Sequence, residues 1–322
     1  MSLSRRTVLG GAAATAATFP VSVTLSRRAL AAEATAQAPA FHRMAVGNIT
    51  VTAIADGHLS LGAQVFPNAS EEDFAAAMRA AFLPEDQPYA APLNAYVVQT
   101  GDRTILIDAG ASPQMAPSVG KLDENLAAAG IAPDTIDTIL ITHLHPDHIG
   151  GLMTDDGAVR FPNAELMVRE AEVAFWTDPA TRAAAPEGFR PMIDGTNAVV
   201  TAYADQTTRF ADDGEKAPGV TSVSMPGHTP GHTGFRVDDG DASLLIWGDI
   251  IHNAPLQMGN PKIFIGFDID GEQAVATRAS VLDMVTADRT LVAGMHMPFP
   301  GAGHIAAAGE GFAFVPLPWQ YR

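Results

Sequence analysis

Apolar and polar residues alternate with a period of two in several short segments of the chain, which predicts β-strands. The first such segment covers residues 49–55, and Asp56-Gly57 after it predicts a turn. Residues 94–100 and 104–108 read as two strands joined at Gly101-Asp102 in a hairpin. Further strands are expected at residues 136–142, 165–168, 220–225, 234–237, 243–247 and 290–294.

Helices are expected between and after these strands. Ser70 and Asp73 have the spacing of a capping box, which predicts a helix from there to about residue 83. Residues 117–129 place apolar side chains on one helical face, and Gly130 ends that helix. Two more helices are predicted at residues 169–176 and 271–286, whereas residues 178–198, rich in Pro, Ala and Gly, are predicted to be a loop-bearing insertion.

The order of these elements indicates the fold class. Strands outnumber helices and fall in two groups, so the pattern favours a mixed αββα arrangement over a helix bundle or a pure barrel. The chain has 322 residues, of which 47% are hydrophobic. A domain grows to roughly 250–300 residues before its core divides, so we expect a single domain over residues 33–322.

The N-terminus has the features of an export signal. Arg5-Arg6 precedes a small-residue and apolar stretch over residues 10–25, and Ala29-Leu30-Ala31 supplies an A-x-A cleavage site. This is the twin-arginine form of a signal, over residues 1–32, and it predicts a periplasmic or secreted protein exported in the folded state. The alternative is a disordered or amphipathic N-terminus.

Charge and cysteine content restrict the chemistry. Without residues 1–32 the chain has 15 basic and 36 acidic residues, a net charge of −21, which disfavours nucleic acid and anionic membranes and favours a small neutral substrate. Beyond the N-terminus no stretch approaches the roughly 20 apolar residues that span a bilayer. Because the chain contains no cysteine, a zinc site would have only nitrogen and oxygen ligands.

Three histidines and an aspartate occur within six positions directly after the predicted strand 136–142. In an extended segment His143 and His145 point to the same side, so both can bind one metal ion. Asp147 and His148 follow after a turn and would point to a neighbouring position. This ligand set suits Zn²⁺, and also manganese, cobalt or iron.

The other candidate ligands also stand at the ends of apolar strands. His228 lies in a Gly-His-Thr-Pro-Gly-His segment that ends with His232, Asp249 follows the strand 243–247, and His296 follows the strand 290–294. A ligand at the end of a buried strand is held rigidly, as a preorganised metal site requires.

These motifs together resemble the metallo-β-lactamase superfamily, with H-x-H-x-D-H, then G-H-T-P-G-H, then G-D and a late histidine. The resemblance implies an α/β fold, an αβ/βα four-layer sandwich with a dinuclear metal site at the edge of the two sheets. It implies that His143, His145 and His228 bind one divalent ion, most simply Zn²⁺. Asp147, His148 and His296 would bind the second ion, and Asp249 would bridge the two.

A closer resemblance is to the methyl parathion hydrolase-like group and the quorum-quenching lactonases, on residues 142–152, 161–164, 175–176, 227–233, 248–249 and 299–304. It implies a hydroxide that bridges two metal ions and attacks a neutral apolar ester, a lactone such as an acyl homoserine lactone, or an organophosphate triester. Asp147 or Asp249 would pass a proton to the leaving group. The resemblance also suggests a homodimer.

Residues around the metal ligands are expected to support the ligands, to line a substrate pocket or to have structural roles. His232 is expected to support the ligands rather than to bind metal, since the ligand set is already full. His304 is expected equally to line the pocket or to have a structural role, whereas His42, His58 and His252 are expected at the surface or in structural roles. Candidate apolar pocket walls are Phe66, Met115, Phe175, Trp176, Phe189, Phe264, Phe267 and Phe299, with Trp176 and Phe189 favoured for their place beside the 178–198 insertion.

Other functions of such a scaffold have sequence requirements that differ from this one. A β-lactamase of the common subclasses uses a cysteine ligand, which is absent, and a nuclease needs a basic surface. A thioesterase similar to glyoxalase II needs a basic cluster for glutathione, of which the C-terminal region offers little. A non-enzymatic metal-binding protein on the same fold is the alternative from a different class.

Overall fold

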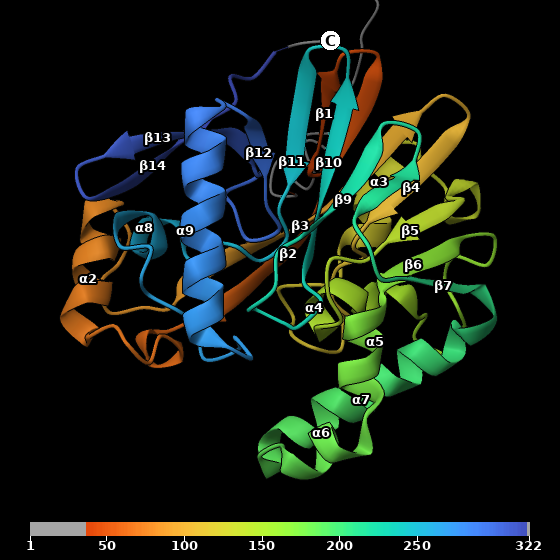
Figure 1. Cartoon of the computed structure of the whole chain (residues 1–322), viewed down its shortest axis with the longest axis horizontal. Helices are drawn as coiled ribbons and strands as arrows, with labels where there is room; N and C mark the ends of the chain where they lie inside the picture. The colour runs from red at the N-terminus through yellow and green to blue at the C-terminus, as the bar shows by residue number, and fades with distance from the viewer. Residues whose placement is uncertain (1–36, 321–322) are drawn as a thin grey trace, which may run out of the picture. The chain divides into compact units, whose positions relative to one another are not determined.

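Two mixed β-sheets of seven strands each form the centre of the structure, a computed structural model that describes residues 37–320 (Figure 1). The chain from Pro39 onward forms one compact unit. The predicted export signal at residues 1–32 lies outside the described residues. Within the described part, no helix is long and apolar enough to cross a membrane.

The N-terminal sheet contains its strands in the order of the sequence, from β1 to β7. Its first four strands pair antiparallel, and β4 to β7 pair parallel. The strands are β1 (Phe41–Val46), β2 (Ile49–Leu61), β3 (Tyr89–Thr100), β4 (Arg103–Ile107), β5 (Thr138–Leu140), β6 (Glu165–Arg169) and β7 (Thr207–Phe210).

The C-terminal sheet has the order β14-β13-β12-β11-β10-β9-β8, and all its neighbours are antiparallel except β11 and β12. Its strands are β8 (Gly214–Ala217), β9 (Val220–Ser224), β10 (Thr233–Asp239), β11 (Ala242–Ile246), β12 (Leu291–Ala293), β13 (Ala302–Ala308) and β14 (Gly311–Pro316).

Helices cover the outer faces of both sheets (Figure 1). They are α2 (Glu71–Ala80), α3 (Leu122–Ala128), α4 (Pro146–Ile149), α5 (Glu170–Thr177), α6 (Pro179–Ala184), α7 (Arg190–Ala202), α8 (Ala254–Gly259) and α9 (Gly271–Ala287). Short 3₁₀ turns complete the set at η1 (Ala63–Val65), η2 (Pro133–Thr135), η3 (Gly150–Leu152), η4 (Glu187–Phe189) and η5 (Ala204–Gln206).

The period of two along β3 explains why the sheets stack. Tyr96 and Val98 are buried between the two sheets, against Phe235 of β10 and its neighbours. Ala95 and Val97 point to the opposite face and pack with α3, α4, α5 and α7. A third cluster packs α8 and α9 against the C-terminal sheet. The layers are therefore helices, sheet, sheet and helices, the αβ/βα sandwich that the sequence resemblance implied.

Most predicted elements occur near their expected bounds. The capping box of Ser70 and Asp73 is formed and begins α2, and β3 and β4 make the predicted hairpin. The helix expected from residue 117 begins only at Leu122. The strands β1, β7, β8, β13 and β14 and the helix α8 were not predicted.

Two predictions about local structure were wrong. Residues 178–198 are mostly helical rather than a loop, since they contain α6 and most of α7. Asp56-Gly57 is not a turn, because β2 continues through it with a register shift between Ala55 and Gly57. Gly57 has a φ of 131°, and a Cβ there would lie 1.9 Å from the carbonyl oxygen of Ser118, so only glycine fits this bulge.

The carboxylate of Asp56 connects this bulge to the segment that follows β4. It accepts hydrogen bonds from the backbone N–H groups of Ala111, Gly120 and Leu122, at 2.9, 3.2 and 2.8 Å. Burial raises the pKa of Asp56 to about 6, and these hydrogen bonds oppose the shift only in part. A charged carboxylate at this position therefore costs folding free energy.

We expect this buried carboxyl to make the stability of the protein depend on pH. Since the pKa of Asp56 is higher in the folded than in the unfolded chain, its contribution is full below about pH 4 and is lost as the pH rises through about 6. Asp56→Asn removes this titration. The difference in unfolding free energy between wild type and variant, measured by urea denaturation, should therefore fall from about pH 4 to about pH 7. A difference that stays constant over this range would contradict the assignment.

Candidate metal centre

Three imidazole nitrogens converge where the segment after β5 meets the segment after β9. His143 Nε2 lies 3.0 Å from His145 Nδ1 and 3.1 Å from His228 Nε2. His143 and His145 lie two residues apart, and both side chains are buried. The three ligand atoms lie within 4.8 Å of one another, so one metal ion can be bound by all of them.

A second group lies beside the first. Asp147 and His148 belong to α4, which begins with Pro146 directly after His145. Asp147 Oδ2 lies 3.5 Å from His148 Nε2 and 3.5 Å from His296 Nε2. Their ligand atoms also fall within 4.8 Å of one another. The single turn of helix thus places both side chains beside His296, which follows β12, while the ring of His148 also packs on His143 of the first group at 4.0 Å between ring centroids.

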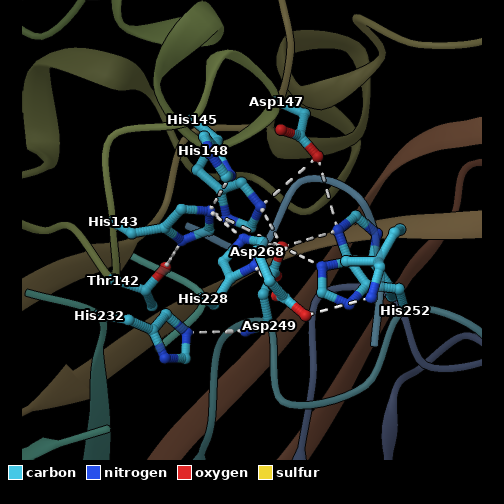
Figure 2. A network of polar contacts seen from close by, with 12 residues as sticks. Thr142, His143, His145, Asp147, His148, His228, His232, Asp249, His252 and Asp268 are labelled. Atoms are coloured by element: carbon cyan, nitrogen blue, oxygen red, sulfur yellow. Dashed lines mark hydrogen bonds and ion pairs between the residues drawn. The ribbon is translucent and has the colours of Figure 1, made fainter. Parts of the chain in front are cut away.

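Asp249 lies between the two groups (Figure 2). Its Oδ2 is 3.3 Å from His228 Nε2 of the first group and 3.2 Å from His296 Nε2 of the second. The same oxygen is 3.3 Å from His148 Nε2. One carboxylate is therefore within reach of metal ions in both groups, and all seven predicted ligands belong to one cluster.

The chemistry of the cluster fits bound divalent cations. His148 Nε2 and Asp249 Oδ1 are buried and have no hydrogen-bond partner. Buried polar atoms are normally paired, and each unpaired one costs about 1–3 kcal/mol. Nitrogen lone pairs directed at one another at about 3 Å repel unless a proton or a cation lies between them. Nitrogen and oxygen ligands in this arrangement are those that Zn²⁺ and similar ions use.

Buried carboxylates hold two of the imidazoles from behind. Asp108 Oδ2 is 2.6 Å from His148 Nδ1, and Asp108 also accepts hydrogen bonds from the N–H and hydroxyl of Thr142. Asp268 Oδ1 is 2.7 Å from His228 Nδ1. A carboxylate on the far ring nitrogen fixes the orientation of the imidazole and makes it a stronger ligand.

His232 lies behind the ligands rather than among them. Its Nδ1 is 2.8 Å from the carbonyl oxygen of Met225, and its Nε2 accepts a hydrogen bond from the backbone N–H of Asp249 at 2.9 Å. The residue before Asp249 must be glycine: Gly248 has a φ of 61°, and a Cβ there would lie 2.3 Å from His232 Nε2. His232 therefore fixes the backbone that carries Asp249.

Glu172 of α5 connects the two segments that carry the first group. Its carboxylate accepts hydrogen bonds from Leu144 N, Gly231 N and Trp176 Nε1, at 3.0, 2.7 and 2.9 Å. Leu144 separates His143 from His145, and Gly231 follows His228 by three residues. Glu172 is fully buried, and burial raises its pKa against the effect of these hydrogen bonds. The position of the first ligand group thus depends on this side chain.

Electrostatics keep the first two imidazoles in the form that binds metal. Burial, and then the neighbouring His148, lowers the pKa of His143 well below its usual value. Burial, and then His228, does the same to the pKa of His145. Asp249 acts on both in the opposite direction. Both rings are therefore neutral near pH 7. A neutral imidazole has the free lone pair that a metal ligand needs.

A cavity of about 360 Å³ opens above the cluster. One side is formed by candidate ligands, among them His145, Asp147 and Asp249. The opposite walls are largely apolar and come from the end of β2, from the segment between β4 and α3, from α7 and from the segment before α9: Leu59, Leu61, Met115, Met192, Ile265 and Phe267. No lysine or arginine is among the described residues that line it.

The predicted pocket residues are only partly found at this cavity. Met115 and Phe267 line it. The prediction of Trp176 as a pocket wall was wrong, because its ring is buried in the helical core. There it lies edge-on to His145, with 5.3 Å between ring centroids, and its indole N–H donates a hydrogen bond to Glu172. His304 is exposed on β13. The remaining candidates, Phe66, Phe175, Phe189, Phe264 and Phe299, also do not line the cavity.

Sequence similarity now identifies the family. Residues 89–296 match the Metallo-beta-lactamase superfamily. The chain belongs to the metallo-β-lactamase superfamily. Members of this superfamily are generally hydrolases, and the ligands of the candidate metal centre are distributed along the matched segment from His143 to His296. The matched residues include all seven candidate ligands.

Curated relatives match parts of this metallo-β-lactamase chain. The uncharacterised protein YobT of Bacillus subtilis is 30% identical over 165 residues, which are 50% of this chain and 63% of that protein. The N-acyl homoserine lactonase AiiB of Agrobacterium fabrum is 35% identical over 77 residues, 18% of this chain and 28% of the lactonase. The matches thus span less than two thirds of both relatives.

Solved structures match over most of the chain. The hydrolase AbOPH of the β-lactamase superfamily has a TM-score of 0.83 and 29% identity, covering 89% of this chain and 100% of that one. AidC, a dizinc quorum-quenching lactonase, also has a TM-score of 0.83 at 23% identity, covering 88% and 99%. At that identity the second match shows the shared fold alone.

Four residues of this metallo-β-lactamase site were missed by sequence reasoning. Asp108 ends a predicted strand, the same signal that marked Asp249, so it was detectable. His252, assigned to the surface or to a structural role, is buried and joins a candidate ligand group with His228 and Asp249. Its place three residues after Asp249 was the available signal. Neither Glu172 nor Asp268 stands in any pattern that marks it.

Replacing Glu172 tests its role in holding the first ligand group. Glu172→Gln keeps the shape but offers one acceptor oxygen for three donors, so we expect metal affinity to fall about 10–100-fold. Competition with a chromogenic chelator measures this affinity. The matched control is Glu170→Gln, an exposed position on the same helix, which should bind metal as the wild type does. Equal affinity in all three proteins would contradict the assignment.

Proposed function

We propose that this protein is a dinuclear metal-dependent hydrolase of small neutral esters, foremost lactones such as acyl homoserine lactones. The observation that carries the proposal is the position of Asp249, between two ligand groups and at the base of an apolar cavity. Two divalent cations would supply Lewis acidity that makes a water molecule nucleophilic near neutral pH and polarises the substrate oxygen.

The walls of the cavity support a neutral substrate. Leu61 and Ile265 are buried, and Met115 and Phe267 are partly exposed at the entrance. No lysine or arginine of the described residues lines the cavity, so a glutathione thioester or a phosphodiester backbone would find no cationic side chain there. The formal net charge of −17 over the whole sequence acts against anionic substrates as well.

Proton transfer to the leaving oxygen is assigned to Asp147. Both Asp147 and Asp249 line the cavity, but the side chain of Asp147 is 14% exposed whereas that of Asp249 is only 2% exposed. Asp147 also stands at the start of α4, whose backbone N–H groups favour a negative charge at that end. A carboxylate at the cavity surface can accept the proton that the attacking water loses and then donate it to the alkoxide of the opened lactone ring.

A lactone substrate is tested first by comparing reaction classes. The metal-loaded protein is assayed for kcat/KM on a γ-lactone series with acyl homoserine lactones, on an aryl ester and on methyl paraoxon. We expect a lactone preference above about a hundredfold, equal to about 2.7 kcal/mol of differential transition-state binding. A preference for methyl paraoxon would instead assign an organophosphate triesterase. Absence of turnover on every substrate would reject the substrate class.

His252 is proposed to contact the substrate. Its ring lines the cavity, stacks on His296 at 5.2 Å between ring centroids and lies with Nε2 3.1 Å from Asp249 Oδ2. Apart from this contact with the Asp249 carboxylate, neither ring nitrogen has a hydrogen-bond partner among the described residues. The backbone of His252 is fixed by Gln257 Oε1, which accepts its N–H at 2.7 Å. A rigid, unpaired imidazole beside the cluster is placed to hydrogen-bond the substrate oxygen.

Two variants test this contact. His252→Leu removes the hydrogen bond and should lower kcat/KM for a lactone about 10²-fold, whereas His252→Gln, which keeps an N–H donor, should lose much less. Metal content by mass spectrometry is the second readout, and it should stay at the wild-type value in both variants. Loss of one metal ion from both would assign His252 as a ligand instead.

A further inference from the structure

A second, larger cavity continues from the catalytic one. It has a volume of about 830 Å³, and we call it the α7 groove because that helix forms one wall. Met115, Pro146 and Met192 line both cavities. Pro146 stands between the candidate ligands His145 and Asp147. The α7 groove therefore begins directly beside the place where the reacting group of a substrate would lie.

One face of α7 forms the wall of this groove. Met192, Gly195, Thr196 and Val199 all line it, with the spacing i, i+3, i+4 and i+7 of a single helical face. Facing them are Ile149 and Met153, so much of the lining is apolar. Polar residues such as Gln114, Thr154 and Asp155 line the remaining walls. The apolar part of this lining, along α7 and beside Ile149 and Met153, can accommodate a hydrocarbon chain.

Gly195 keeps the middle of this helical face free of side chain. A Cβ at this position would meet no atom within 4 Å, so the space beside it is open. Glycine inside a helix costs about 0.8–1.0 kcal/mol relative to alanine. The methionines at 115, 153 and 192 adapt their shape to different ligands, which suits a channel for a flexible chain.

We propose that the α7 groove binds the hydrocarbon chain of the substrate, so that the protein prefers esters or lactones with long acyl chains. This inference rests on the proposed function for the reacting group, and it adds where the rest of the substrate lies. The ester group occupies the catalytic cavity, and the chain passes between Met115 and Met192 to lie along α7. Because the two cavities share three lining residues, a chain attached to the ester group can continue from the catalytic cavity into the α7 groove.

A chain-length series tests the groove in the wild-type enzyme. N-acyl homoserine lactones from butanoyl to dodecanoyl present the same reacting ring with increasing hydrocarbon. Burial of a methylene contributes about 0.8 kcal/mol, so kcat/KM should rise by up to about fourfold per added methylene until the groove is filled. Turnover of the butanoyl substrate with no dependence on chain length would overturn the proposal while leaving the proposed function intact.

Filling the groove gives the sharper test. Gly195→Phe places a ring in the open space, so kcat/KM should fall at least tenfold for the dodecanoyl substrate and stay within twofold for the butanoyl one. The matched control is Gly188→Phe, at another exposed glycine with nothing within 4 Å, which does not line the groove. Gly188→Phe should keep the wild-type chain-length profile. An equal loss on both substrates in Gly195→Phe would contradict the proposal.

A binding measurement separates this proposal from the hydrolase activity. Decan-1-ol and butan-1-ol are titrated calorimetrically into the wild type and the Gly195→Phe variant. Tighter binding of decan-1-ol to the wild type, lost in Gly195→Phe, supports the groove even if no ester is turned over. Equal binding to both proteins overturns it. A Gly195→Phe variant with altered sedimentation but an unchanged chain-length profile would assign the groove to an interface between copies, which also overturns the proposal.

Discussion

The burial of imidazoles and carboxylates at one point is the constraint on which the rest of the structure depends. His143, His148 and Asp249 are almost completely inaccessible to water, and His148 Nε2 and Asp249 Oδ1 have no hydrogen-bond partner among the described residues. In a medium of low dielectric such a cluster is unfavourable unless every lone pair is directed at a cation. The surrounding structure must therefore hold each ring in one orientation, and a displacement of one ligand affects all the others.

The two sheets meet this requirement in similar ways. The N-terminal sheet supplies His143 and His145 just beyond β5, and the C-terminal sheet supplies Asp249 just beyond β11 and His296 just beyond β12. Strands buried on both faces cannot shift without disturbing the core between the sheets. Polar side chains behind the ligands complete the support: Asp108, Glu172 and His232 each connect a ligand segment to another element.

Much of this centre was predictable because the signal is local. Four ligands fall within six positions and the other three each follow an apolar run, so the pattern of polarity marked them as candidates, and the family resemblance grouped them into one centre. The fold followed from the same pattern and from the family resemblance. Glu172 has no comparable signal, because its partners are backbone N–H groups of segments that lie 28 and 59 residues away in the chain.

Other features depended on tertiary contacts that a single sequence does not display. Asp56-Gly57 reads as a turn, yet the backbone of the segment after β4 pairs with the Asp56 carboxylate and lets β2 continue. Trp176 reads as a pocket wall, but its N–H finds a buried carboxylate and the ring turns into the core. The helix period of α7 was hidden by its proline and glycine, so its role as a wall became visible only from the folded chain.

The division of the ligands between the two sheets also links metal binding to the association of the two halves of the domain. His143, His145, Asp147 and His148 come from the first half of the sandwich, and His228, Asp249 and His296 from the second. A cation that binds ligands from both halves favours the state in which the sheets are packed together, by RT ln(1 + [M]/Kd) for each site. Metal concentration would then act as a thermodynamic variable of the fold, and removal of metal by the surroundings would lower the stability of the sandwich as well as the activity of the site.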